Sequence, residues 1–229
     1  MTACGATAGT ATSTATTQTA AAVAATTTAE NAPDHDDPAD HVWDTATEQA
    51  IALSGATAQS TSDGVSVDGS TVTITAAGTY RISGSLTDGQ IAVDTADAGI
   101  VRLVLDGASV SSSSGSALLV TDADEVMVVL ADGSANSLSD GTGYVDTSAD
   151  AAANSSTDQP NAALYSTAGL TIAGNGSLTV DGNSADGITS KDGLVITGGD
   201  ITVTAVDDAI RGKDYVVIDD GTVTATAGG

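Results

Sequence analysis

The chain has 229 residues, a formal charge of −25 at pH 7, 30 acidic residues against 5 basic ones, and no phenylalanine. This charge repels nucleic-acid phosphates and anionic lipid headgroups, so it excludes electrostatic binding to either. One cysteine excludes a disulfide framework, and two histidines, both before residue 42, exclude a histidine-centred catalytic triad in the rest of the chain. No apolar run approaches the roughly 20 residues of a membrane helix.

Residues 1–49 predict a disordered tether. Residues 5–30 are nearly all Thr, Ala, Ser and Gly, which bury too little apolar surface to fold. Residues 31–41 add proline and negative charge, as is typical of a solvated acidic linker. The aspartates and two histidines of this linker could instead bind a transition metal.

The first five residues, Met-Thr-Ala-Cys-Gly, resemble the end of a bacterial lipobox, in which a small residue precedes a lipidated cysteine. The resemblance implies a lipid anchor at Cys4, which would be the only contact of the protein with a membrane. The basic and apolar regions of a signal peptide do not precede it, so the alternatives are a chain that starts late or an ordinary free thiol.

From residue 50 onward the chain repeats every 22–24 residues. Apolar residues alternate with polar ones in short segments bounded by Gly, Asp or Asn, and this period of two predicts strands. Three short strands per repeat predict one coil of a right-handed parallel β-helix, in which stacked coils pair in parallel. The predicted core stacks are Leu170, Leu194 and Val216; Ile172, Ile196 and Ile218; Leu178, Ile201 and Val223; and Leu164, Ile188 and Ile210.

Three parts of the predicted domain, residues 50–229, depart from the regular repeat. Residues 50–130 alternate in the same way but more loosely, and the Ser/Ala/Asp/Gly stretch at 140–159 predicts a protruding loop. The chain stops at Gly228 and Gly229, where the repeat demands another turn, so we expect a domain that is truncated at its C-terminus.

Several motifs of this domain occur in the order found in a known family. With them, residues 50–229 resemble a bacterial family of secreted carbohydrate-binding β-helix proteins, similar in fold to pectate lyases. The resemblance implies a lipid-anchored or secreted protein of the bacterial surface, which binds calcium and plant cell-wall polysaccharide such as cellulose or pectin without cleaving it. One departure is Ala209, where many members have glycine. The motifs are Gly78–Leu86, Val101–Gly107, Asn161–Ser166, Gly176–Val180, Asp186–Ile188, Ser190–Leu194 and Asp207–Tyr215.

The repeat also stacks aspartates, because an offset of 22 places Asp186 on Asp208 and Asp192 on Asp214. Like charges opposite one another destabilise neighbouring strands unless a cation lies between them, and Ca²⁺ takes roughly six to eight oxygen ligands. These four residues and Asp207 therefore predict a calcium site. Alternatively, the aspartates cap turns and are neutralised by neighbouring lysines. A halophilic origin would also explain the aspartate surplus.

Three functions remain open. The first is a monomeric, non-catalytic, calcium-dependent module that binds cellulose or a pectin-like polysaccharide. The second is a structural spacer without glycan binding, and the third is a calcium-dependent polysaccharide lyase. Arg211 is the candidate base of a lyase, although arginine normally stays protonated. The aromatic residues that could stack on sugars are Trp43, Tyr80, Tyr144, Tyr165 and Tyr215.

Overall fold

The computed structural model describes Met1, residues 34–142 and residues 159–229. The predicted tether residues 2–33 with Cys4, and Tyr144 of the predicted loop, lie outside the described residues. The fold is that of the unit Asp34–Gly229, and it is all-β apart from two short 3-10 helices, η1 (Pro38–His41) and η2 (Thr45–Thr47). No helix in the described ranges is long and apolar enough to cross a membrane.

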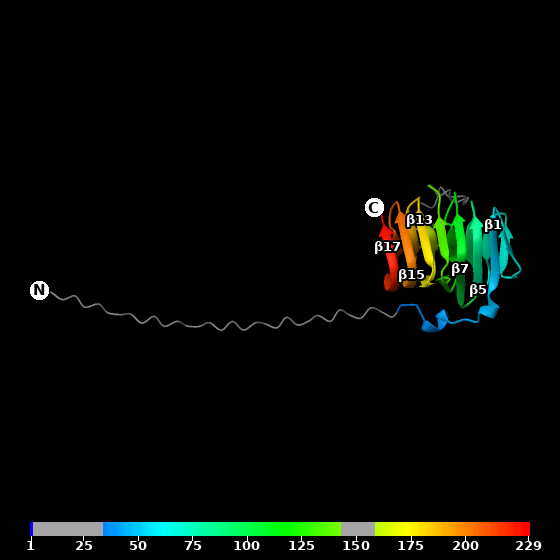
Figure 1. Cartoon of the computed structure of the whole chain (residues 1–229), viewed down its shortest axis with the longest axis horizontal. Helices are drawn as coiled ribbons and strands as arrows, with labels where there is room; N and C mark the ends of the chain where they lie inside the picture. Colours follow the sequence, from blue (N-terminus) through cyan, green and yellow to red (C-terminus); the bar gives the residue numbers. More distant parts are fainter. Residues whose placement is uncertain (2–33, 143–158) are drawn as a thin grey trace. The chain divides into compact units, whose positions relative to one another are not determined.

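The strands lie side by side, with β1 near one end of the unit and β17 at the other (Figure 1). They form two sheets within the described residues. The first sheet contains β1 (Gln49–Gly55), β2 (Ala58–Ser60), β5 (Gly78–Leu86), β7 (Ile100–Ser111), β9 (Glu125–Leu130), β10 (Ala135–Ser139), β12 (Gly169–Gly174), β13 (Ser177–Gly182), β15 (Gly193–Ala205) and β17 (Tyr215–Thr226).

The second sheet has the strand order β16-β14-β11-β8-β6-β4-β3. Its strands pair in parallel except at the end, where β3 and β4 are antiparallel. Its members are β3 (Val65–Asp68), β4 (Thr71–Ile74), β6 (Gln90–Asp94), β8 (Leu118–Asp122), β11 (Ala162–Ser166), β14 (Asp186–Ser190) and β16 (Ile210–Gly212).

The predicted right-handed parallel β-helix with three short strands per coil is wrong. Hydrogen-bond pairing closes six parallel strands of the first sheet into a ring, in the order β10, β13, β15, β12, β9, β7 and back to β10, while the second sheet stays separate. The ring closes because β7 and β15 run on where the repeat predicted a break between two strands. Gly107 and Gly199 adopt φ of 74° and 94°, which lets each strand bend instead of ending.

The predicted register of the stacks is confirmed, whereas the predicted core positions of Val216 and Ile218 are wrong, because these side chains of β17 are 42% and 53% exposed. Leu170 pairs with Leu194 and Leu194 with Val216, at offsets of 24 and 22 residues. The stacks that begin at Ile172, Leu178 and Leu164 also follow the predicted partners. The repeat length therefore fixes which residues lie above one another, although it does not fix where each strand ends.

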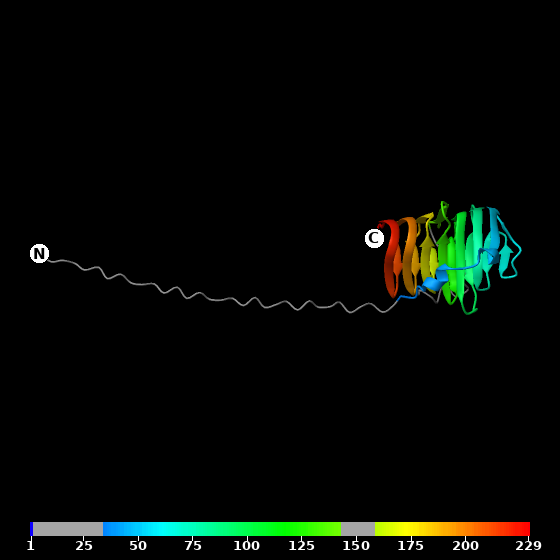
Figure 2. The ribbon, with the colours of Figure 1, turned by 60° about the horizontal axis from the view of Figure 1, so that its bottom comes forward.

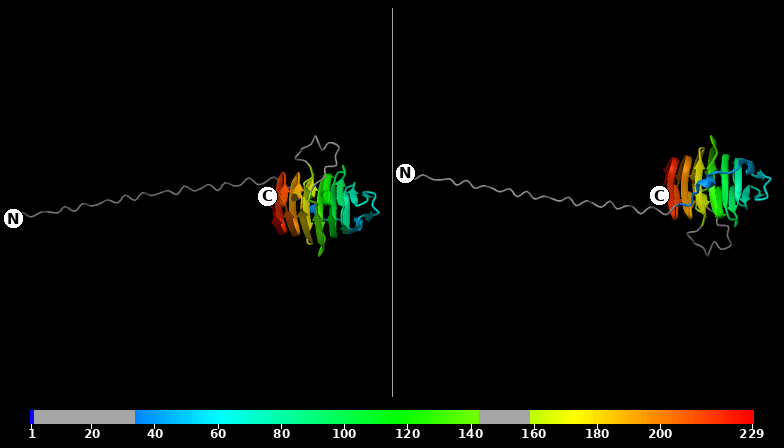
Figure 3. Two further views of the ribbon diagram at one scale, coloured as in Figure 1. Left: turned by 90° about the horizontal axis from the view of Figure 1, so that it is seen from above. Right: turned by 90° about the horizontal axis from the view of Figure 1, so that it is seen from below.

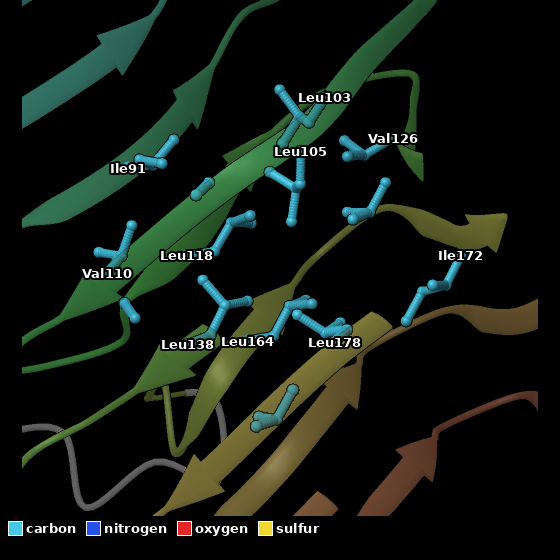
Figure 4. Packing of buried hydrophobic residues seen from close by; sticks show 14 of the residues in the cluster. Ile91, Leu103, Leu105, Val110, Leu118, Val126, Leu138, Leu164, Ile172 and Leu178 are labelled. Carbon is cyan, nitrogen blue, oxygen red and sulfur yellow. The ribbon is translucent and has the colours of Figure 1, made fainter. Parts of the chain in front are cut away.

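The core lies between the inward faces of the two sheets. In β7, Leu103 and Leu105 are fully buried, and so is Leu118 of β8 in the other sheet. Figure 4 shows these side chains together with Leu138 and Leu164 in one layer of aliphatic residues. A core without phenylalanine is thus filled by stacked Leu, Ile and Val, the residues that suit pleated strands.

Residues 34–48 differ from the expected tether, because they lie against the first sheet; we call them the strap. Figure 2 and the right-hand view of Figure 3 show the strap, in blue, crossing the strands from the β17 end toward β1. The compact unit begins at Asp34 instead of residue 50. The reason is that the outer face of the sheet beneath the strap is apolar, as described below.

Truncation of Leu103 should measure the contribution of the stacked core. Its neighbours in the register are Tyr80 and Val128, so Leu103→Ala leaves a cavity that costs about 2–5 kcal/mol of unfolding free energy. Urea unfolding followed by circular dichroism checks this value. Val206→Ala, at a side chain that is 57% exposed, is the control, and an equal loss in both variants would contradict the account.

Candidate functional site

The predicted calcium corner contains one buried carboxylate with protein partners of its own. Asp186 is fully buried, and its Oδ2 accepts hydrogen bonds from Asn161 Nδ2 at 2.8 Å and from Thr189 Oγ1 at 2.9 Å. The backbone N–H of Asp208, one repeat later, donates to Asp186 Oδ1 at 3.3 Å. Asp186 therefore connects neighbouring turns, which is the capping role that the sequence left open.

Of the other predicted ligands, Asp208 lies beside Asp186, because its N–H donates to that carboxylate. The side chains of Asp192, Asp207, Asp208 and Asp214 are exposed, and Asp192 Oδ1 accepts from the N–H of Gly193. In the part of the chain that the structure describes, no three His, Cys, Asp or Glu side chains are arranged to hold a metal.

Two features at Asp186 bear on a cation there. Asn161 Oδ1 is buried and has no hydrogen-bond partner, which would suit a cation. Opposing this, Nη1 of Arg211 lies 3.9 Å from Asp186 Oδ2 and 3.9 Å from Asp208 Oδ2, so a positive group already faces both carboxylates. The corner fits calcium poorly, and calcium binding stays a prediction. Arg211 occupies the position of a pairing residue between two carboxylates.

Aspartate caps recur elsewhere between neighbouring repeats. Asp97 accepts from the N–H of Ala77 at 3.2 Å, and Asp124 accepts from the N–H of Gly99 at 3.0 Å. Part of the aspartate surplus is therefore turn chemistry, since these carboxylates satisfy backbone groups at the strand ends.

A second candidate site lies on the outer face of the first sheet, under the strap. Val104, Met127, Val129 and Ala173 form an apolar cluster there, separate from the core, and Trp43 of the strap packs against it. These residues alternate with core residues along β7, β9 and β12, so the sheet is apolar on both faces at this point. A two-sided apolar sheet requires a cover, which the strap provides.

Glu48 fixes the orientation of both Trp43 and Arg81. Its Oε1 accepts from Trp43 Nε1 at 2.9 Å and from Arg81 Nη2 at 3.1 Å, while its Oε2 accepts from Arg81 Nε at 2.6 Å. The hydrogen bonds from Arg81 hold the pKa of Glu48 below its usual value. Arg81 Nη1 reaches Asp106 at 3.0 Å. Through its hydrogen bonds to Glu48 and Asp106, Arg81 of β5 joins the end of the strap to β5 and β7.

Two further contacts hold the strap across the sheet. Arg102 of β7 donates to the carbonyl oxygen of Asp40 at 2.6 Å and to its carboxylate at 3.0 Å. At the other end, His35 Nδ1 lies 2.7 Å from the hydroxyl of Tyr215 in β17, and His35 Nε2 lies 3.1 Å from Thr171 Oγ1 in β12. Burial lowers the pKa of His35, which favours the neutral ring in these contacts.

Glu125 is the exception among the polar groups near the strap. Its Oε1 is buried and has no hydrogen-bond partner among the described residues. Burial first, and then the negative charges of Asp40, Asp36 and Asp124, raise the pKa of Glu125 to about 7, against a smaller opposing effect of Arg102. The docked strap therefore favours a protonated Glu125.

The strap and the sheet enclose a groove of about 510 Å³. Its floor is apolar, and its rim carries carboxylates, an amide and a guanidinium, as is typical of a site for a small polar ligand with one apolar face. Asp132 Oδ1 on the rim accepts from Asn175 Nδ2 at 2.9 Å. The groove is lined by His41, Trp43, Arg81, Val104, Asp106, Val129, Leu130, Ala131, Asp132, Ala173, Gly174 and Asn175.

Trp43 belongs to the predicted tether in the sequence, whereas in the structure it packs on the sheet. The signal that could have corrected this is the run Val126–Leu130, which is continuously apolar where a strand with one solvated face would alternate. Such a run predicts that something covers the outer face of the sheet.

Three comparisons with known proteins give similar sequences and a similar structure. A family model described as "Carbohydrate-binding domain-containing protein" matches residues 68–229. A relative from Acetivibrio thermocellus with the same description is 39% identical over 143 residues, which are 62% of this chain and 48% of the relative, so the match spans about half of the relative's length. A solved polysaccharide lyase-like protein from C. thermocellum, a gadolinium derivative, is similar with a TM-score of 0.69 and 32% identity, over 79% of this chain and 82% of that chain.

Removal of the Asp186 carboxylate should destabilise the fold without any metal present. Asp186→Ala orphans buried donors on Asn161 and Thr189, and we expect it to lower the unfolding free energy by about 3 kcal/mol in EDTA. Urea unfolding measures this loss. The exposed Asp214 provides the control, for which Asp214→Ala should change stability by less than about 0.5 kcal/mol. A loss that occurs only when calcium is present would contradict the capping role.

Stability should fall as pH rises between about 4.5 and 7 because of Glu125. The folded state holds a proton on Glu125 up to a pKa of about 7, whereas the unfolded chain releases it near the usual value of 4.5. The unfolded state thus binds fewer protons in this range, and unfolding becomes easier with rising pH. Urea unfolding at several pH values gives the unfolding free energy as a function of pH. This free energy should fall less steeply with rising pH in Glu125→Gln than in the wild type. The same pH dependence of the unfolding free energy in both proteins would contradict a protonated Glu125 in the folded state.

Proposed function

Because the chain belongs to the family of carbohydrate-binding domain-containing proteins, we propose that it is a non-catalytic module that binds polysaccharide through the Trp43 groove. The observation that carries this proposal is the joint position of Trp43, an apolar floor and a polar rim in one open groove. A pyranose ring has the matching pattern, with apolar C–H groups on its faces and hydroxyl groups around its edge.

The preorganisation of the groove supports binding. Glu48 holds the indole N–H of Trp43 and the guanidinium of Arg81, so neither side chain has to be ordered when a ligand arrives. Groups that are already ordered lose less conformational entropy on binding than flexible ones. The polar groups Asp132 and Asn175 are exposed on the rim and can exchange water for sugar hydroxyls.

The rim carboxylates suit binding better than catalysis. Glycoside hydrolysis needs one carboxyl group that donates a proton and a second that acts as base or nucleophile. Asp106 and Asp132 both accept hydrogen bonds, from Arg81 and Asn175 respectively. Arg211, the candidate base of a lyase, does not line the groove. Lyase chemistry is the second candidate, because the solved relative is described as polysaccharide lyase-like.

Two finer features belong to the proposal, and the spacer function is the alternative to it. A module for plant cell-wall polysaccharide has to reach its ligand outside the cell, either secreted or anchored through Cys4, which lies outside the described residues. Calcium binding at the acidic turns is part of the proposal, since Ca²⁺ prefers oxygen ligands such as carboxylates and carbonyls. The spacer function predicts no glycan binding at all.

Trp43→Ala should weaken binding to a soluble neutral polysaccharide at least tenfold, because a buried tryptophan contact is typically worth about 2 kcal/mol or more. Isothermal titration calorimetry measures the affinity, and circular dichroism confirms that the sheet remains folded. Trp43→Phe should retain most of the affinity.

The matched control is Val42→Ala, since Val42 precedes Trp43 on the strap and is 76% exposed. Unchanged affinity in Trp43→Ala would remove the groove as the binding site. If the wild type retained none of a panel of cellulose, pectin and other plant polysaccharides, the spacer function would replace the proposal.

A further inference from the structure

The cationic groups of the Trp43 groove are already paired with carboxylates. Arg81 is the only Lys or Arg among the lining residues of the groove. Its Nε and Nη2 donate to Glu48, and its Nη1 donates to Asp106. A guanidinium that is held by two carboxylates has little charge left to attract a third.

His41 is engaged in the same way. Its Nε2 lies 2.9 Å from Asp36 Oδ1 and 3.0 Å from Asp36 Oδ2. Even a protonated His41 would therefore face a carboxylate of the strap before it faced a ligand.

The acidic groups of the groove, in contrast, face outward. Asp106 is 48% exposed in its side chain, and Asp132, which also lines the groove, is exposed. Among the described residues, Asp106 is bound by Arg81 and Asp132 accepts one hydrogen bond from Asn175. Around them the chain as a whole carries a charge of −25, which adds a repulsive field for anions.

We propose that the Trp43 groove selects uncharged sugar chains and rejects uronate chains. Hydroxyl groups of a neutral pyranose can donate to the carboxylates of Asp106 and Asp132, and such charge-assisted hydrogen bonds are strong. A uronate brings its own carboxylate to the same rim, where no unpaired Lys or Arg lines the groove to receive it. Asp132 is then a specificity-determining residue. This inference rests on the proposed function and narrows its substrate class.

The test compares three hexasaccharides with the wild-type protein at pH 7, in EDTA and at fixed ionic strength. The ligands are cellohexaose, hexagalacturonate and the methyl ester of hexagalacturonate, which has the same sugar without the charge. We expect cellohexaose to bind at least tenfold more tightly than hexagalacturonate by calorimetry. The methyl ester should bind at least fivefold more tightly than the free acid. This difference in affinity should become smaller at high salt.

Asp132→Asn keeps the size of the side chain and removes its charge. It should therefore reduce the ratio of the affinities for the methyl ester and the free acid at least threefold. Asp220→Asn, at an exposed aspartate outside the groove, should leave this ratio unchanged. Equal affinity for hexagalacturonate and its ester would overturn the inference while the proposed function stands. Failure of all three ligands to bind would overturn the proposed function, and the inference with it.

Discussion

Parallel pairing in register is the constraint on which the rest of the structure depends. Offsets of 22 to 25 residues between neighbouring strands place Leu194 between Leu170 and Val216, and Val128 beside Leu103. Because the offset repeats, the inward side of every strand adds to one continuous aliphatic core. The same register brings the buried carboxylate of Asp186 to the turn of the next repeat, where it accepts from the N–H of Asp208. Core and turns therefore follow from one periodicity.

The strap is a consequence of what that register leaves on the outside. Met127 and Val129 face away from the core, so the sheet would expose an apolar surface unless another segment covered it. Trp43 supplies the apolar contact, while Glu48 and Asp40 take the arginines of β5 and β7. The cost of this arrangement is concentrated at Glu125, whose buried carboxyl lies near strap aspartates. The groove is the part of the apolar surface that the strap does not fill.

The sequence predicted the stacks but not the strand ends or the strap. Alternation and offset depend only on residue order, which is why Ile172, Ile196 and Ile218 were aligned correctly. Whether a glycine such as Gly107 ends a strand or bends it depends on the neighbouring strands, and the alternation around it is the same in both cases. The contact of His35 with Tyr215 joins residues 180 positions apart, which no local pattern indicates. The offset of 22 also places Asp186 at the turn of Asp208, but an offset carries no information on which side chains, here Asn161 and Thr189, donate to the Asp186 carboxylate.

The central claim is that sugar binds against Trp43, and the fluorescence of this residue tests it most directly because Trp43 is the only tryptophan in the chain. A titration with cellohexaose should shift its emission to shorter wavelength and protect it from acrylamide quenching. Both changes should saturate with the dissociation constant that calorimetry gives. Binding that is seen by calorimetry while the emission and quenching of Trp43 stay unchanged would contradict the account.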